Sequence, residues 1–140
     1  MNDWAARLRY PLAALWLGGL VAVAAIGAPT AFAVVSEKML AAAVASRMFH
    51  LMALGGALCA GVLIVLERQR ASSMSRSGGL LLVAAALALD IVGEFGVVPH
   101  LLAAAASGAA DAARWHVAAS AVYLAQTGCV LAYVWKLSAR

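Results

Sequence analysis

Charged side chains are scarce in this chain of 140 residues. Asp, Glu, Lys and Arg make up 11% of the sequence, whereas hydrophobic residues make up 66%. Soluble domains carry roughly 25% charged residues, so this composition is too apolar for a soluble domain. We therefore predict an integral membrane protein whose first partner is the lipid bilayer.

The signatures of familiar soluble enzymes are also missing. The sequence contains no nucleophile elbow, phosphate-binding glycine loop, zinc signature or dinucleotide-binding fingerprint. Its two cysteines, Cys59 and Cys129, make no metal motif, and we expect them to pack as small apolar residues, with a disulfide as the alternative. The sequence thus favours a protein that is not an enzyme.

Four apolar runs account for nearly the whole chain. Crossing the hydrocarbon core takes about 20 apolar residues, and the candidate spans cover approximately residues 11–35, 48–66, 79–102 and 115–137. Short connections make consecutive helices antiparallel. We predict one domain over residues 1–140, an all-α, integral membrane four-helix up-down bundle, and we find no internal repeat in the residue pattern.

The first run also has features of a secretory signal. Arg7 and Arg9 precede it, and Ala31-Phe32-Ala33 near its end matches an A-x-A cleavage pattern. The run is longer than a usual signal core, so we expect a membrane span. Pro29 is expected to kink or terminate this helix.

Lys and Arg are unequally divided between the two sides of the predicted bundle. Seven fall on the side of the termini and three on the opposite side, so the positive-inside rule predicts that both termini are cytoplasmic, in a bacterial inner membrane. The seven are Arg7, Arg9, Arg68, Arg70, Arg76, Lys136 and Arg140, and the three are Lys38, Arg47 and Arg114. Because these residues are topology signals in loops, the net charge of +4 does not indicate nucleic-acid binding.

Asp90 and Glu94 are carboxylates inside the third apolar run. Charged groups are costly in a bilayer, so intramembrane carboxylates are functional candidates by default. On a helix their spacing of four residues puts both on one face. Asp90 lies about 17 Å along the helix from Gly79, near the midplane, and Glu94 lies about 6 Å closer to the outer face.

Several basic residues are predicted at the outer ends of the helices, near Glu94. We predict an outward-facing polar cluster of Arg47, His50, Glu94, His100, Arg114 and His116, and we expect no similar group in the cytoplasmic half. Glu94 is either paired with Arg47 or Arg114 or part of an outward-opening ion or proton site.

Asp90 has no basic residue at its own depth. Tyr123, Gln126 and Thr127 are predicted at this level of the fourth helix. We expect Asp90 either to be protonated, because burial disfavours the charged form, or to be hydrogen-bonded to one of these three residues. In either state it can relay protons, bind a cation or hold helices together.

The histidines allow a second kind of chemistry. His50 and His116 begin neighbouring helices at similar depth, and two facing imidazoles can hold a b-type haem or a metal. Met48, His50 and Met52 contain ligands suited to copper. On a helix, however, His50 points away from the face shared by the two methionines, so packing methionines are the better interpretation.

Small residues recur at helical spacing and let helices approach closely. They pack either inside the bundle or against another subunit, so a homo-oligomer or a larger membrane complex is a possible assembly. The pairs are Gly18 and Ala22, Gly56 and Ala60, Ala57 and Gly61, and Gly128 and Ala132.

Three short motifs carry a family resemblance. They are Leu15-Trp16-Leu17-Gly18-Gly19, Val98-Pro99 and Arg114-Trp115-His116. With them the chain resembles the bacterial membrane family catalogued as domain of unknown function 4149, which also contains eukaryotic transmembrane protein 205. The resemblance covers nearly the whole chain and implies a four-helix membrane protein. The eukaryotic branch is associated with drug resistance and trafficking, with no chemistry to carry over.

The order of further residues fits this family. Pro29 and Phe32 match a proline and an aromatic late in helix one, and Glu94 precedes the aliphatic-proline step that ends helix three. Two positions depart from the pattern: Val117 stands where the family usually has glycine, and His100 where it often has a basic residue. Close approach of a helix or ligand at position 117 is therefore not implied.

These observations lead to two functional hypotheses. The first is a small polytopic membrane protein without catalytic activity or cofactor, either a subunit or scaffold of a membrane assembly or an oligomer that handles small solutes or ions. The alternative is a redox membrane protein that binds b-type haem, copper or another metal, with His50 and His116 as ligands.

Overall fold

The computed structural model describes residues 3–69, 74–108 and 110–139. Within these ranges it contains helices and no strand, as predicted for an all-α protein. The elements in chain order are α1 (Asp3–Ala22), η1 (Val23–Gly27), α2 (Ala28–Val34), α3 (Lys38–Arg68), α4 (Met74–Ile91), η2 (Val92–Val97), α5 (Val98–Ser107) and α6 (Ala112–Ser138), where η marks a π-helical segment.

These elements form four long rods, each apolar and long enough to cross a bilayer. The rods cover Arg7–Val34, Lys38–Arg68, Gly78–Ser107 and Ala112–Ser138. The protein is thus a multi-pass, four-helix membrane protein, as predicted. The second rod begins ten residues before its predicted span because alanine-rich sequence from Lys38 onward continues the helix past Arg47.

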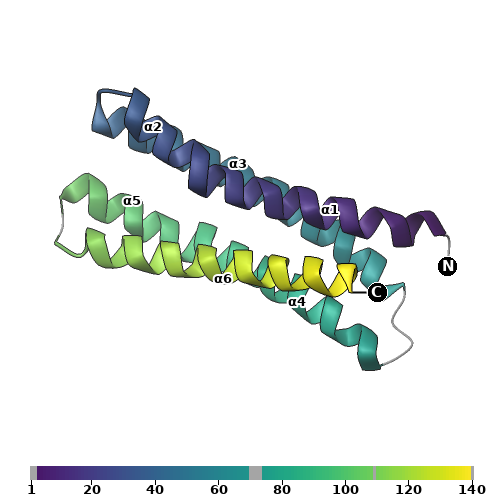
Figure 1. The fold of residues 1–140 in the computed structure, drawn as a ribbon. Coiled ribbons are helices and arrows are strands. Elements are labelled where there is room, and N and C mark those ends of the chain that lie inside the picture. Colours follow the sequence, from purple (N-terminus) through teal and green to yellow (C-terminus); the bar gives the residue numbers. More distant parts are fainter. Residues whose placement is uncertain (1–2, 70–73, 109, 140) are drawn as a thin grey trace.

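The rods pair into two helical hairpins (Figure 1). The first hairpin joins α1, η1 and α2 to α3, and the second joins α4, η2 and α5 to α6. Both chain termini lie at one end of the bundle, which we call the terminal end; the short turns within the hairpins lie at the opposite end. The hairpins contact each other through α1 on α6 and through α3 on α4.

A π-helical segment precedes a proline in both hairpins. Pro29 follows η1 and Pro99 follows η2, each as the second residue of the next α-helix. Proline lacks an N–H and clashes with the carbonyl four residues before it, and the wider π turn accommodates this defect. Pro29 therefore does not terminate the first rod, which continues through α2 to Val34.

Seven pairs of buried positions, in the terminal half and the middle of the bundle, are related by an interval of 70 residues, although the residue types seldom recur. The equivalent buried positions are Arg9 and Gly79, Ala13 and Val83, Trp16 and Ala86, Leu20 and Asp90, Gly56 and Gln126, Ala60 and Val130, and Leu63 and Tyr133. The expectation of no internal repeat was therefore wrong at the level of structure, because the repeat lies in burial and helix geometry.

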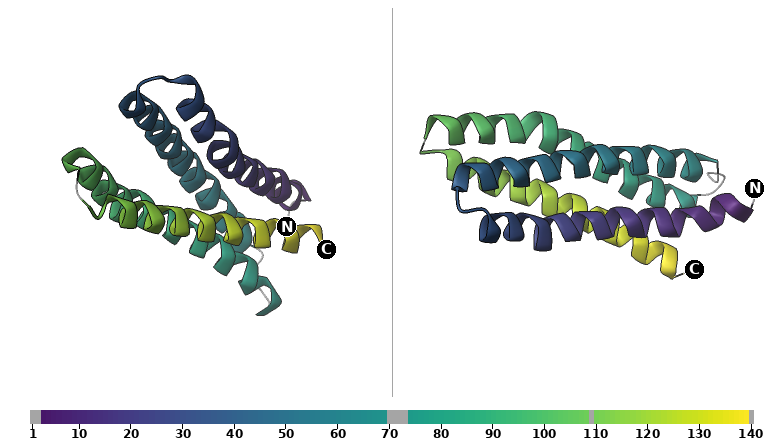
Figure 2. Two further views of the ribbon diagram at one scale, coloured as in Figure 1. Left: turned by 60° about the vertical axis from the view of Figure 1, so that its left-hand side comes forward. Right: turned by 90° about the horizontal axis from the view of Figure 1, so that it is seen from above.

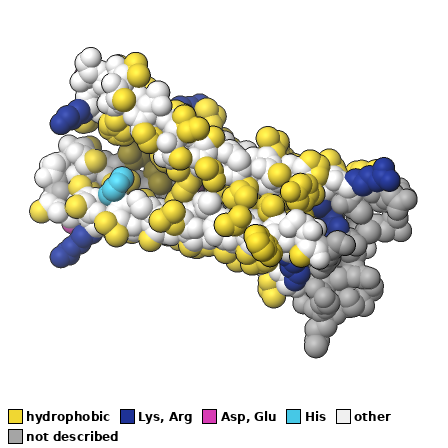
Figure 3. All heavy atoms as spheres, in the orientation of Figure 1, with side chains coloured by type: hydrophobic (Ala, Val, Ile, Leu, Met, Phe, Trp, Pro, Cys, Tyr) yellow, Lys and Arg dark blue, Asp and Glu magenta, His cyan; other side chains and the backbone are white. Residues whose placement is uncertain are grey.

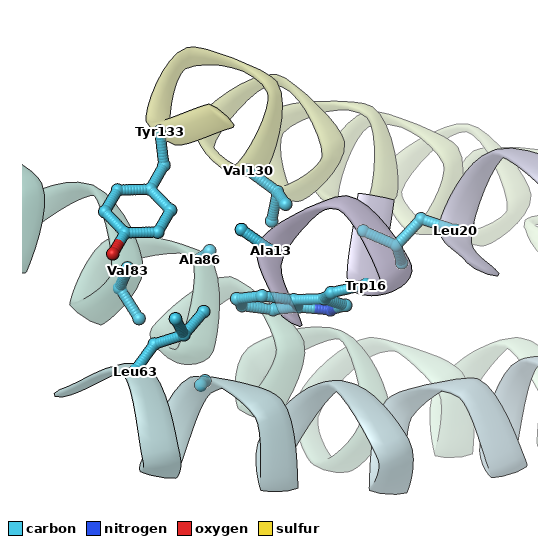
Figure 4. Close-up of a cluster of buried hydrophobic side chains, with 9 residues drawn as sticks. Ala13, Trp16, Leu20, Leu63, Val83, Ala86, Val130 and Tyr133 are labelled. Carbon is cyan, nitrogen blue, oxygen red and sulfur yellow. The ribbon is translucent and has the colours of Figure 1, made fainter. Parts of the chain in front are cut away.

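Side chains from all four rods meet in the terminal half of the bundle (Figure 4). Trp16 is the largest of them and is 1% exposed. Its indole nitrogen approaches Gly56 so closely that a Cβ there would lie 2.7 Å away. The cluster consists of Ala13, Trp16, Leu20, Ala60, Leu63, Val83, Ala86, Val130 and Tyr133.

At the opposite end the two hairpins diverge (Figure 2). Among the described residues, α2 packs on α3 and η1, while α5 packs on α6 and η2, without extensive contact between the hairpins at this level. The space-filling view shows a hollow between them, with hydrophobic side chains along the flanks of the molecule and Lys and Arg near its two ends (Figure 3). The bundle is closed at the terminal end and open at the other.

Candidate functional site

Asp90 lies at the last turn of α4, where it is 7% exposed. The side-chain amide of Gln126 in α6 donates a hydrogen bond of 2.9 Å to its Oδ1. The structure gives no ion pair to Asp90 among the described residues. The sequence left open which of Tyr123, Gln126 and Thr127 bonds to Asp90, and the structure shows that it is Gln126.

Tyr123 and Thr127 lie near this pair but bond elsewhere. The Tyr123 hydroxyl donates 2.8 Å to the backbone carbonyl of Leu20 in α1, and Thr127 donates to the carbonyl of Tyr123 within α6. Tyr123 also meets the ring of Phe49 edge-on, with ring centroids 5.1 Å apart. Tyr123 thus joins the hairpins in the middle of the bundle, whereas Thr127 bonds within α6, and neither is bonded to Asp90.

A pocket of about 40 Å³ lies between α3 and the α4–η2 rod, with both carboxylates in its wall. Its other walls are hydrocarbon. The lining residues are Ala53, Leu54, Ala57, Asp90, Ile91, Glu94 and Phe95. A cavity needs about 10–15 Å³ of such space to hold one water molecule, so the pocket has room for a few water molecules.

The internal repeat relates the pocket to the other interface between the hairpins. The 70-residue interval relates Ala53 and Ala57 to Tyr123 and Thr127 at the other interface between the hairpins. There the Tyr123 side chain lies against Leu20, to whose carbonyl it bonds. At the α3–α4 interface the equivalent residue is an alanine, so the space beside Asp90 stays open.

Glu94 lies in η2, one turn closer to the opposite end. Its Oε1 is hydrogen-bonded to Nδ1 of His50 in α3, with side chains that are 15% and 37% exposed respectively. The pairing of Glu94 with Arg47 or Arg114 is therefore corrected. Both arginines are exposed and form no ion pair among the described residues.

The other two histidines are not brought to this pair. The His100 ring stacks on Trp115 with centroids 4.6 Å apart, and His116 is exposed on α6. Of the residues in the predicted outward cluster, only His50 and Glu94 are thus brought into contact in the described structure. Among the residues the structure describes, no three His, Cys, Asp or Glu side chains are grouped to hold a metal.

A haem or metal role for His50 and His116 stays a prediction. His50 has a carboxylate on its Nδ1, which leaves Nε2 as the nitrogen available to a ligand. An absorption spectrum with metal analysis of the native protein tests this hypothesis directly. A purified chain without a Soret band and without bound metal would remove it.

A family model, Domain of unknown function (DUF4149), matches residues 12–110 of the chain. The chain belongs to this family. The matched range includes the candidate pocket, both π-helical segments and the Trp16 motif, and it ends before α6. No curated protein and no solved structure is significantly similar to the chain.

The chain has a second cluster of polar side chains, which the sequence did not predict. At the terminal end, Arg9 Nη1 of α1 donates 2.6 Å to Glu67 Oε1 of α3, and the Tyr133 hydroxyl of α6 donates 2.8 Å to the same oxygen. Arg9 is 5% and Glu67 4% exposed. The expectation of no polar grouping in this half was wrong, because charges at the ends of apolar runs were interpreted as topology signals.

The third rod also contacts this group, so that all four rods meet there. A Cβ on Gly79 of α4 would lie 3.0 Å from Glu67 Oε2, so glycine allows α4 to approach the carboxylate. The only sequence signal was a glutamate, Glu67, among basic residues at the end of an apolar run. We call Arg9, Glu67 and Tyr133 the terminal clasp.

The cysteines and several small residues lie outside both polar clusters and serve in packing or face the surface. Cys59 and Cys129 are free, half-buried and packed against the core cluster. Of the small-residue pairs, Gly56 and Ala60 are buried against Trp16 and its neighbours. Gly18 and Gly128 lie on the exposed surface with no atom near the position of a Cβ.

Proposed function

We propose that this small membrane protein binds and relays a proton at Asp90, with access from the end of the bundle opposite the termini. The single observation that carries the proposal is the pocket whose wall contains both intramembrane carboxylates. Asp90 has an amide donor on Oδ1 and no cationic partner among the described residues. A buried carboxylate without a counter-ion is expensive in a bilayer, and binding a proton removes its charge.

The size and chemistry of the pocket favour a proton over a larger cation or a solute. Apart from the two carboxylates its lining side chains are apolar, which is too few oxygens to replace the hydration shell of a metal cation. A proton needs one oxygen. In the proposed binding step a hydronium ion transfers a proton to Asp90 Oδ2 and leaves a water molecule, and the carboxylate becomes a neutral carboxylic acid that keeps its bond from Gln126.

Glu94 and His50 support a route to Asp90. They share a hydrogen bond, and Glu94 shares the pocket with Asp90. His50 lies twelve residues, about 18 Å, from the start of α3, and its side chain is 37% exposed. We therefore infer a relay in the order His50, Glu94, Asp90 through the middle of the bundle.

The experiment is proton flux into proteoliposomes, measured with a pH-sensitive dye under an imposed membrane potential. Asp90→Asn should abolish the protein-dependent flux, and Glu94→Gln should reduce it. Asp111→Asn and Glu37→Gln are matched controls because these carboxylates are exposed at the helix ends. Flux that is the same for Asp90→Asn and Asp111→Asn would reject the proposal and leave Asp90 as a helix-pairing residue.

We also propose the orientation and assembly of the chain. The excess of Lys and Arg on the terminal side supports cytoplasmic termini in a bacterial inner membrane. Exposed Gly18 and Gly128 support contact with another helix, in a homo-oligomer or a larger complex. Topology reporters fused to either terminus test the orientation, and the mass of the mildly solubilised native particle tests the assembly. Purification of a single chain alone would reject the assembly.

A further inference from the structure

Three side-chain hydrogen bonds join the two hairpins within the described part of the chain, and they lie at three levels. His50 and Glu94 bond toward the opposite end, and Tyr123 bonds to the Leu20 carbonyl in the middle. Tyr133 bonds to Glu67 at the terminal end. The hairpins thus have a central attachment, with one separable contact on either side of it.

The two bonds of Glu67 differ in which parts they connect. Arg9 and Glu67 belong to the same hairpin, so their ion pair moves with that hairpin as a unit. Tyr133 belongs to the other hairpin. If the hairpins separate at the terminal end, only the Tyr133 bond breaks, and Glu67 keeps its counter-ion.

This division lowers the cost of parting the terminal clasp itself, to which separation of the apolar cluster around Trp16 adds its own cost. Removing one partner of a buried ion pair leaves an uncompensated charge, which proteins rarely tolerate. The loss of one hydroxyl donor from a carboxylate that remains paired changes an equilibrium by roughly tenfold or somewhat more. The contact between the hairpins is therefore the weaker link of the terminal clasp.

The terminal clasp lies at the terminal end of the bundle, so a proton moving from Asp90 toward that end would have to pass it. The apolar cluster around Trp16 lies in this half of the bundle, and its polar side-chain atoms are the Trp16 indole nitrogen and the Tyr133 hydroxyl (Figure 4). The opposite end is open, since the hairpins diverge there (Figure 2). A proton on Asp90 can leave toward the termini only after the cluster and the clasp have parted.

We infer that the hydrogen bond between Tyr133 and Glu67 is the gate at the terminal end of the proposed proton path. While it is intact the hairpins are closed there and open at the other end. When it breaks, the hairpins turn about the contact of Tyr123 with Leu20, and water reaches the core from the terminal end. Arg9 is a positioning residue that neutralises Glu67 in both states. This inference rests on the proposed function.

The native cysteines are reporters for this movement. Cys59 and Cys129 are free, and both pack against the apolar cluster three residues on the terminal side of Gly56 and Gln126. The experiment measures labelling of each, in the Cys129→Ser or Cys59→Ser background, by a membrane-impermeant methanethiosulfonate reagent. Proteoliposomes are sorted by orientation with a protease-cleavable C-terminal tag.

The test variant is Tyr133→Phe, which removes one hydroxyl and keeps the buried ring. We expect labelling from the terminal side to rise roughly tenfold, the factor set by one hydrogen bond to a carboxylate, with labelling from the opposite side unchanged and Tm lowered by only about 4–8 °C. Tyr10→Phe, which alters an exposed tyrosine, should label like the wild type. Unchanged labelling of Tyr133→Phe, or an equal rise from both sides, would overturn the gate.

Labelling and flux can fail separately. If Tyr133→Phe opens the terminal side while Asp90→Asn leaves proton flux intact, the proposed function fails and the hinge between the hairpins stands. If Asp90→Asn abolishes flux while Tyr133→Phe changes neither labelling nor flux, proton binding stands and the gate lies elsewhere.

Discussion

At the scale of single residues, Gly56 sets how closely α1 and α3 approach. The Trp16 ring is buried and rigid, and its nitrogen would lie 2.7 Å from a Cβ at this position. We expect Gly56→Ala to lower the free energy of unfolding by about 1–3 kcal/mol, the usual cost of overpacking, despite the higher helix propensity of alanine. Thermal unfolding in detergent measures the effect.

Gly55→Ala is the matched control for this substitution. The neighbouring glycine has no atom within 4 Å of its Cβ position, so alanine there should keep or raise Tm. Equal Tm values for the two variants would show that Trp16 does not limit the approach of these helices.

The stability of the terminal clasp should depend on whether one or both members of its ion pair are replaced. Glu67→Gln leaves the guanidinium of Arg9 buried without a counter-ion, and we expect a loss of about 3–5 kcal/mol of stability. The double variant Arg9→Leu/Glu67→Leu removes both charges and should recover most of this loss. A double-mutant cycle on Tm measures the difference, and a double variant as unstable as Glu67→Gln would contradict it.

The two polar groups differ in how far the sequence reveals them. Asp90 stands in the middle of an apolar run, where any carboxylate demands a partner, and Gln126 was predicted at the matching depth. Arg9 and Glu67 stand at the ends of such runs, where charges ordinarily face water and lipid headgroups. Their burial follows from the packing of four helices, which no local pattern contains.

At the scale of elements, the prolines mark both π-helical segments, but the sequence predicted only a kink or an end. Whether a helix ends, bends or widens at proline depends on what its next turn packs against. Here α2 packs along α3 and α5 packs along α6. Each rod therefore forms a wider π-helical turn and continues as a helix past its proline. The wider turn η2 also contains Glu94, which places its carboxylate opposite His50.

Deletion of Gly96 tests the role of proline in this widening. Removing one residue from η2 forces an ordinary α-helical turn and recreates the clash of Pro99 with the carbonyl four residues before it, so we expect a loss of about 3 kcal/mol. Adding Pro99→Ala to the deletion should restore most of the stability, as measured by Tm in detergent. If the second change does not help, the π turn has another cause.

At the scale of the whole molecule, the repeat conserves burial and geometry while the chemistry differs between its halves. Asp90 and Gln126 occupy the positions of Leu20 and Gly56 in the first hairpin. Because lipid-embedded helices need only apolar or small residues at most positions, two halves can share a fold with few identical residues. Composition and spacing therefore predicted the four-helix bundle, but not its division into equivalent hairpins.

This division predicts an asymmetry in water access that can be measured along a single helix. Ala53 lines the pocket beside Asp90, whereas Ala60, two turns nearer the terminal end of α3, is completely buried. In a background with both native cysteines changed to serine, Ala53→Cys should react with an impermeant thiol reagent added on the side opposite the termini. Ala60→Cys should resist the reagent from either side, since the closed half of the bundle excludes water. Equal protection of both positions would mean that the pocket is not connected to water at the open end, and Asp90 would then lack the access that proton binding requires.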